Sequence, residues 1–172
     1  MNKAVMLSIR PKWVEKIANG EKTIEVRKTQ PKLETPFKCY IYCTLPKYPH
    51  EDFIATDYPM PQFYGGGKVV GEFTCDQIID AWWDYVPDAI TREVTGGNLE
   101  ALDGIGMTDE ELFSYVGDSM RGHCYGWHIS DLLIYDQPKG LDEFTRLRET
   151  KFGSEPVTIK RAPQSWCYGE EG

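Results

Sequence analysis

Closely spaced ionisable side chains mark the segment Gly20–Arg27, which reads Gly-Glu-Lys-Thr-Ile-Glu-Val-Arg. In a strand, alternate side chains point to opposite faces, so its polar and apolar residues should separate. The polar face carries Thr23, Glu25 and Arg27, and Lys22 lies where the strand begins. Two cations can hold a phosphate or a polarised carbonyl oxygen. A glutamate between them can accept a proton, or a hydrogen bond from an exocyclic amine. This spacing is consistent with a polar cleft.

The same alternation also fits a solvated strand face with paired charges. Each such pair would contribute at most about 1 kcal/mol to stability. The pattern alone leaves both interpretations open.

Aromatic residues near the C-terminal half offer a second kind of ligand contact, because a base can stack on an exposed ring. The candidates are Tyr125, Trp127, Trp166 and Tyr168. In a strand-rich domain, aromatic residues at alternating positions also fill the core, and that interpretation is favoured for Trp127. Trp166 fits either role, and its neighbours Gln164 and Ser165 could donate hydrogen bonds to a ligand.

Metal and cofactor motifs are missing from the sequence. Possible metal ligands are Cys39, Cys43, His123, Cys124 and His128, but they form no CxxC or HxxxH pair. In a strand, the odd separation of His123 and His128 would point them to opposite faces. There is also no P-loop, GxGxxG or GxSxG motif, which disfavours nucleotide hydrolysis, dinucleotide binding and α/β-hydrolase chemistry. We therefore expect no metal and no cofactor.

The N-terminal elements that would position the charged segment have clear local signals. The apolar run Val5–Ile9 predicts a strand that stops at Arg10. A short amphipathic helix should follow over Pro11–Ala18 and end at Asn19-Gly20. The alternating segment Thr23–Arg27 then predicts a half-buried strand, and Lys38–Thr44 a central one.

The rest of the chain predicts further strands and one more helix. Proline and glycine make 46–67 an irregular insertion, and Lys68–Cys75 resumes strand character ahead of an acidic insertion at about 76–107. Thr108 and Glu111 match a capping box for a helix that runs to Val116. The later expected elements are one long or two short strands over His123–Tyr135, a turn at Gln137–Gly140 and helical turns over Leu141–Arg148. Many strands with two helices indicate an α+β barrel.

Length and composition predict one globular domain over residues 1–172. The net charge of −8 argues against coating nucleic acid, yet residues 1–50 hold ten Lys and Arg against four Asp and Glu. A local site for an anionic ligand is therefore compatible with the N-terminal part. Five cysteines without paired spacing, together with no apolar run of about 18 residues, favour the reducing cytoplasm and no membrane contact.

An ordered set of motifs along the chain resembles the ASCH domain family. The motifs are Ser8-Ile9-Arg10-Pro11-Lys12, the Gly-x-Lys-Thr-x-Glu-x-Arg pattern of Gly20–Arg27, and Val70-Gly71-Glu72-Phe73. The stretches Tyr125–Ser130 and Pro163–Tyr168 look like the version common in phage and prophage proteins. The resemblance implies a PUA-like, mostly antiparallel β-barrel with a few short flanking helices. It also implies binding of RNA or of a modified nucleoside or nucleotide, with Arg10, Lys22, Glu25, Arg27 and Trp166 around the ligand.

Two other functions stay open. Some relatives are small amidohydrolases that remove an acyl group from N4-acylated cytidine with a Lys, a Thr and a Glu. Their Lys matches Lys22, which would act as base or oxyanion partner, whereas their Thr falls at Glu25 and leaves Thr23 as the nearest hydroxyl. Near the position of their Glu this chain has Asp103. Alternatively, the acidic, tryptophan-rich stretch Asp76–Glu93 would make the chain a protein-interaction module.

Overall fold

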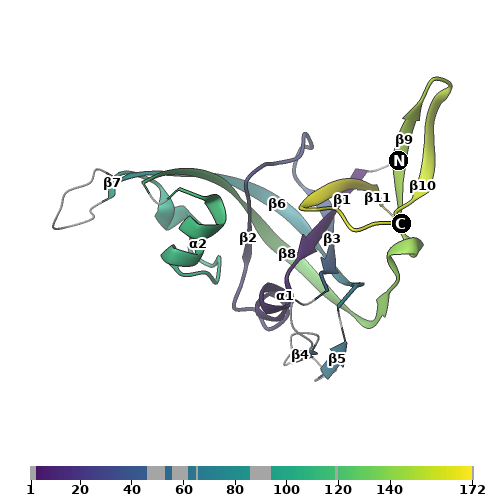
Figure 1. The fold of residues 1–172 in the computed structure, drawn as a ribbon, viewed down its shortest axis with the longest axis horizontal. Helices are drawn as coiled ribbons and strands as arrows, with labels where there is room; N and C mark the ends of the chain where they lie inside the picture. The colour runs from purple at the N-terminus through teal and green to yellow at the C-terminus, as the bar shows by residue number, and fades with distance from the viewer. Residues whose placement is uncertain are drawn as a thin grey trace.

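A seven-stranded mixed sheet forms the centre of the molecule, a computed structural model that describes residues 3–45, 53–55, 62–64, 66–85, 94–118 and 120–171 (Figure 1). The strands run in the order β11-β1-β3-β6-β8-β2, with β7 added to β6. Their bounds are Lys3–Ile9 (β1), Ile24–Arg27 (β2), Phe37–Cys43 (β3), Lys68–Tyr85 (β6), Val94–Gly97 (β7), Arg121–Lys139 (β8) and Trp166–Glu170 (β11).

In the described residues, two hairpins and four helical segments surround this sheet. The hairpins are β4 (Phe53–Ala55) with β5 (Gln62–Tyr64), and β9 (Thr145–Thr150) with β10 (Gly153–Thr158), which projects from the body in Figure 1. The helices are α1 (Pro11–Ala18) and α2 (Asp109–Val116), and the 3-10 turns are η2 (Leu99–Leu102) and η3 (Leu141–Glu143). None of the helices in these described parts is long and apolar enough to cross a bilayer.

The pairing of the strands confirms the predicted α+β, mostly antiparallel fold. Among the strands that the structure describes, only β1 and β3 pair in parallel, and α1 with β2 lies between them in the chain. Every other pair of neighbouring strands is antiparallel, and β6 and β8 form one long ribbon. That ribbon connects the barrel body to β7 and α2 (Figure 1).

Side chains close the seam between β2 and β11, the two ends of the strand order. Arg27 of β2 donates to the carbonyl oxygens of Ser8 in β1 and Ser165 just before β11, at 2.9 and 3.1 Å. The indole of Trp166 donates to the Thr29 hydroxyl at 3.0 Å. Among the described residues the strand order is open between β2 and β11, so no backbone ladder closes the predicted barrel and these side-chain bonds link the two ends of the sheet.

The core has apolar clusters on both sides of the sheet. Val5, Leu7, Ile41, Phe73 and Trp127 belong to the cluster beneath α1. The opposite face of β1 and β3 buries a second set, which includes Met6 and Tyr40. A third cluster packs α2 and η2 against β2 and the β6–β8 ribbon. Burial on both faces explains why β1 reads as a continuous apolar run and not as an alternation.

Both predicted helices are confirmed, and the C-terminal elements differ from the prediction. The strand β8 continues to Lys139, which pairs with Val69, so the turn predicted at Gln137–Gly140 is wrong. Helical structure after Gly140 is limited to Leu141–Glu143, because the next residues form β9 and pair with β10. The expected insertion at 46–67 is described only at β4, β5 and its last residues, and the acidic stretch is described up to Tyr85 and again from Val94.

Candidate functional site

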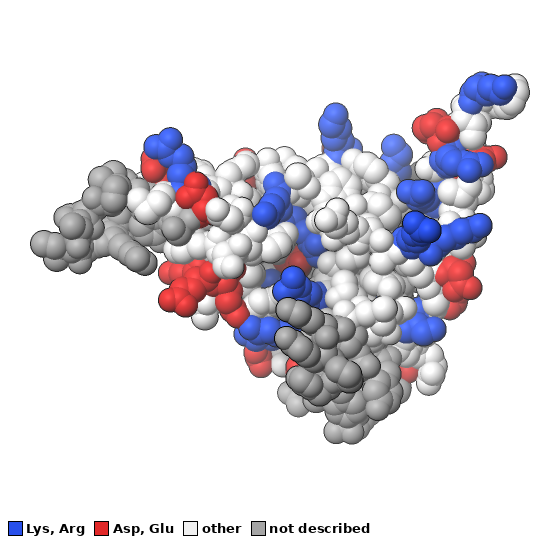
Figure 2. All heavy atoms as spheres, viewed as in Figure 1, with Lys and Arg blue, Asp and Glu red and all other residues white. Residues whose placement is uncertain are grey.

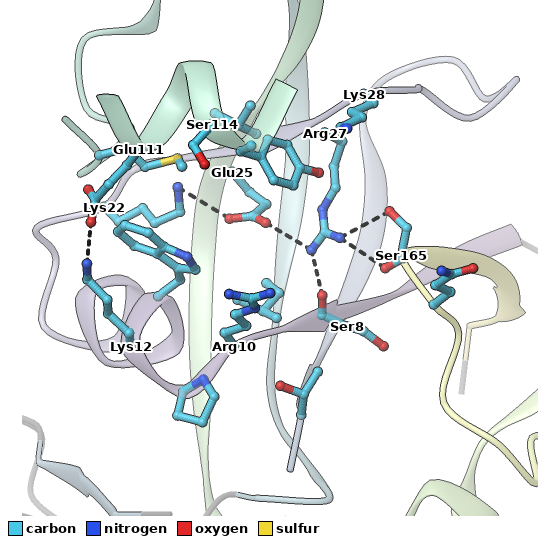
Figure 3. A pocket seen from close by; sticks show the side chains of 18 of the residues that line it. Ser8, Arg10, Lys12, Lys22, Glu25, Arg27, Lys28, Glu111, Ser114 and Ser165 are labelled. Carbon is cyan, nitrogen blue, oxygen red and sulfur yellow. Dashed lines mark hydrogen bonds and ion pairs between the residues drawn. The ribbon is translucent and has the colours of Figure 1, made fainter. Parts of the chain in front are cut away.

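A cavity of about 1480 Å³ lies among α1, β2, α2 and the segment before β11 (Figure 3). Its polar lining includes Ser8, Arg10, Lys22, Glu25, Arg27 and Ser165. In the space-filling view, Lys and Arg side chains gather between α1 and β2, and acidic side chains gather beside them towards α2 (Figure 2). The predicted polar cleft therefore has a counterpart in the structure.

The floor of the cavity carries a row of three buried charges. The Lys22 ammonium lies 3.3 Å from one carboxylate oxygen of Glu25, and the other oxygen lies 2.9 Å from Arg27 Nη2. Lys22, Glu25 and Arg27 are only 2%, 6% and 5% exposed. The expectation of a half-buried strand is thus wrong, because the charged face of β2 is covered as completely as its apolar face.

Lys22 is held by the loop that follows η2. Its ammonium donates to the Ile105 carbonyl at 2.6 Å and lies 5.5 Å from the ring centre of Trp13. Gly104 and Gly106 give this loop its path, since both have positive φ, and the Gly104 carbonyl accepts from the backbone of Thr23 at 2.8 Å. Burial lowers the pKa of Lys22, and the Glu25 carboxylate counteracts part of that shift.

Arg27 connects the charged row to the barrel seam. Besides Glu25, its guanidinium bonds the Ser8 carbonyl and both the carbonyl and the hydroxyl of Ser165. The remaining donor, Nε, is buried and has no hydrogen-bond partner among the described residues. One of the five guanidinium hydrogens therefore stays unsatisfied next to the cavity.

The helices frame the cavity because of local sequence signals. Pro11 occupies the first helical position of α1, Val14 and Ile17 are buried, and Gly20 ends the helix at a φ of +83°, which sends Lys22 inward. The capping box of Thr108 and Glu111 starts α2. The Glu111 carboxylate also pairs with Lys12 of α1, so one ion pair links the two helices across the cavity (Figure 3).

The other predicted site residues lie in different places. Arg10 lines the cavity, is exposed and makes no side-chain hydrogen bond or ion pair with the described residues. Thr23 precedes β2, is exposed and does not line the cavity. Its hydroxyl faces the η2 loop, since a β-carbon at Gly104 would lie 2.3 Å from the Thr23 oxygen. The structure therefore brings Arg10, Lys22, Glu25 and Arg27 together, but not Thr23.

Trp166 stands at the seam and not in the cavity wall. Its ring packs against Trp127 and Tyr168 with centroids 5.9 and 5.3 Å apart, and its indole nitrogen is bonded to Thr29. Trp127 is fully buried in the core, as predicted. Trp166 thus borders the site through Thr29 and Ser165, which do line the cavity.

Several lining residues were missed by the sequence reasoning. Ser114 and Tyr115 come from α2, Trp13 from α1, and Lys28 directly follows β2. Lys28 could have been found by extending the charged segment by one residue. The two α2 residues could not, because nothing local indicates that this helix packs beside β2.

The candidate metal ligands are dispersed in the structure. His123 pairs with Asp80 at 2.5 Å and His128 with Asp76 at 2.6 Å, both on the exposed surface of the β6–β8 ribbon. Cys39 and Cys43 are buried, and burial raises the pKa of the Cys39 thiol well above its usual value. In the ranges that the structure describes, no three His, Cys, Asp or Glu side chains converge on a common point.

Comparison with known proteins identifies the fold. Neither a protein-family model nor a curated protein sequence matches this chain. Similar solved structures include the ASCH protein from Zymomonas mobilis, at 16% identity and a TM-score of 0.50, covering 96% of this chain and 86% of that one. A single-substitution variant of the same protein gives 14% identity and a TM-score of 0.51, covering 96% and 88%. The chain has the ASCH-domain fold, as its motifs predicted.

Proposed function

We propose that this ASCH-fold protein binds a nucleoside unit, free or as part of RNA, in the cavity between α1, β2 and α2. The observation that carries the proposal is the buried row of Lys22, Glu25 and Arg27 on the cavity floor. Removing charges from water costs several kcal/mol per ion, and apolar residues of similar volume often give equal or greater stability. A binding role explains why this strand carries charges there.

The row keeps hydrogen-bonding capacity for a ligand. The Glu25 carboxylate has about four acceptor positions, of which Lys22 and Arg27 use two, so it can still accept from an exocyclic amine. The Lys22 ammonium has three hydrogens and, among the described residues, two polar partners, Glu25 and the Ile105 carbonyl. Adjacent donors and an acceptor match the polar edge of a nucleobase.

Aromatic walls complete the resemblance to a base-binding pocket. Trp13 of α1 and Tyr115 of α2 both line the cavity, and Tyr115 is 36% exposed. A base that reaches the charged floor passes between these helices. Stacking of a base on one aromatic ring contributes about 1–3 kcal/mol.

Calorimetric titration with the four ribonucleosides and a short single-stranded RNA tests the proposal. We expect Glu25→Gln, which keeps the size of the side chain and removes its charge, to weaken binding at least tenfold. The matched control is Glu34→Gln, an exposed residue outside the cavity lining. Ser114→Trp, at an exposed position of the lining, should fill the cavity and abolish binding without touching the buried row. Binding that survives both site variants would reject this cavity.

A second candidate is hydrolysis of an N4-acylated cytidine. The pKa of Lys22 is lowered by burial, which favours the neutral amine that can accept a proton. Thr23 lies outside the cavity, so the attacking group in this version is water activated by Lys22. Release of cytidine from N4-acetylcytidine, lost in Lys22→Met and retained in Thr23→Val, would support it. The absence of any release by the unmodified protein would eliminate it.

A further inference from the structure

We infer that the cavity recognises a phosphate group, so that its ligand is a nucleotide, free or within RNA, and not an uncharged nucleoside. This inference rests on the proposed function and narrows it. It follows from three features of one side of the cavity: an excess of buried positive charge, cations without partners at the mouth, and an uncapped helix start.

The buried row has one more positive than negative charge. Lys22 and Arg27 share a single carboxylate, Glu25, and no other acidic side chain of the described residues lies within ion-pair distance of either. The Nε hydrogen of Arg27 is a buried donor without a partner, on a side chain that is only 5% exposed. Buried charges are normally paired, so the uncompensated positive charge of the row favours an anion in the adjoining cavity.

Unpaired cations also stand at the mouth on the same side. The guanidinium of Arg10 is exposed and has no partner among the described residues, and Lys28 is exposed with its ammonium 5.5 Å from the ring of Tyr115. Figure 3 shows Arg10 and Arg27 both directed into the cavity, with Lys28 above them. Glu111 lies at the opposite side, where Lys12 already neutralises it.

Two further carboxylates, Glu15 and Glu110, belong to the lining and set a limit on the positive potential. Glu15 lies in the middle of α1 and Glu110 in the first turn of α2, and neither forms an ion pair with Lys22 or Arg27. The cavity is therefore polarised and not uniformly basic. A ligand with one anionic group and a neutral base fits such a site better than a polyanion that would fill it.

The N-terminus of α1 opens on the same space. Its first residues, Arg10 to Trp13, line the cavity, no side chain caps the helix, and its first turn contains no acidic residue. Pro11 has no N–H and the Trp13 N–H donates to the Arg10 carbonyl at 2.9 Å, so the positive end of the helix dipole offers a negative group the Lys12 N–H. Together with the exposed cations Arg10 and Lys28, this end forms a place for a phosphate, while Trp13 and Tyr115 remain for the base.

The test compares ligands that differ only in the phosphate. Calorimetry with each ribonucleoside, its 5′- and 3′-monophosphates and inorganic phosphate should show the best nucleotide binding at least tenfold more tightly than its nucleoside. Arg10→Ala should bring this ratio close to one, and Arg161→Ala, an exposed arginine outside the lining, should leave it unchanged. Raising the salt concentration should weaken nucleotide binding more than nucleoside binding.

The outcomes separate this inference from the proposed function. Equal affinities for nucleoside and nucleotide would overturn the phosphate site and leave nucleoside binding intact. Absence of binding by every nucleoside, nucleotide and RNA would overturn the proposed function itself. A ratio above ten that persists in Arg10→Ala and in Lys28→Ala would place the phosphate elsewhere and also refute the inference. An octanucleotide that binds more tightly than any mononucleotide would identify RNA as the source of the phosphate.

Discussion

Charged side chains on strands occur in two regions of this molecule, and the two regions treat them in opposite ways. The side chains of Glu25 and Arg27 on β2, and of Lys22 just before it, are at most 8% exposed. On the β6–β8 ribbon, Asp80 and His123 pair at similar distance, but their side chains are 67% and 49% exposed. The difference lies in what covers the side chains, because α1, α2 and the η2 loop enclose the charges of β2, whereas the face of the ribbon that carries Asp80 and His123 is exposed.

The comparison shows that a buried charge needs backbone partners as well as an opposite charge. Carbonyl oxygens of Ile105, Ser8 and Ser165 complete the row on β2. On the ribbon, water can replace either member of a pair. We therefore expect substitutions on β2 to be costly and substitutions on the ribbon to be almost neutral.

The largest effect is expected for Glu25→Ala, which leaves two buried cations without a counter-charge. The free energy of unfolding should fall by about 3–5 kcal/mol, measured by urea denaturation. The matched change Asp80→Ala on the ribbon should cost less than about 1 kcal/mol. Similar losses in the two variants would show that burial does not distinguish the regions.

A smaller loss of folding stability is expected for Arg27→Met, because Lys22 still neutralises Glu25. The variant removes the guanidinium hydrogen bonds that close the seam, and stability should fall by about 2–3 kcal/mol. Amide hydrogen exchange should accelerate in β11 and remain slow in β3. Uniform acceleration throughout the sheet would contradict a local role at the seam, and Arg161→Met provides the exposed control.

Removing the N-terminal cap of α2 tests whether this helix, which covers β2, keeps the row of Lys22, Glu25 and Arg27 buried. Thr108→Ala should destabilise the protein by about 1 kcal/mol, because the side chain of Thr108 accepts from the backbone of Glu111. Ser114→Ala on the same helix should change stability by less than about 0.5 kcal/mol. If α2 keeps Lys22 buried, weakening this helix in Thr108→Ala should raise the pKa of Lys22 towards its ordinary value. NMR titration of a labelled lysine can measure the change.

The smallest change in folding stability is expected for a substitution of Asp76 on the β6–β8 ribbon. Its hydrogen bond with His128 lowers the pKa of Asp76, so the folded state binds fewer protons in acid than the unfolded state. The stabilisation is therefore present above the unfolded pKa of about 3.9 and disappears as the pH falls through the lower, folded value. Asp76→Asn should cost at most about 0.5 kcal/mol at pH 7 and nothing near pH 2. A difference that grows in acid would contradict this sign.

Local signals explain which elements were predictable from the sequence. Pro11 with the apolar spacing of α1, and Thr108 with Glu111 for α2, are contained within one helical turn or two, and both helices match the prediction. The turn predicted at Gln137–Gly140 failed because pairing of Lys139 with Val69 outweighed the local preference of Pro138. Sheet pairing of this kind depends on residues far away in the chain.

For the candidate site, too, local signals predicted neighbouring residues but not contacts with distant parts of the chain. The sequence indicated Lys22, Glu25 and Arg27 as a set, because alternation is a local property. It could not show that they are buried, since Ile105 lies 83 residues from Lys22 and Ser165 lies 138 residues from Arg27. Thr23 was a candidate because of the alternation and as the hydroxyl nearest to the threonine position of the amidohydrolases, but its backbone donates to Gly104 and β2 begins one residue later.

The guanidinium of Arg27 both lines the cavity and links the two ends of the sheet. A substitution at this position therefore alters the scaffold together with the lining of the cavity. Other residues line the cavity at exposed positions and do not link the ends of the sheet, such as Arg10, Lys28 and Ser114. Divergence among proteins with this architecture should accordingly begin at the mouth of the cavity, while the arginine of the seam changes only together with its partners.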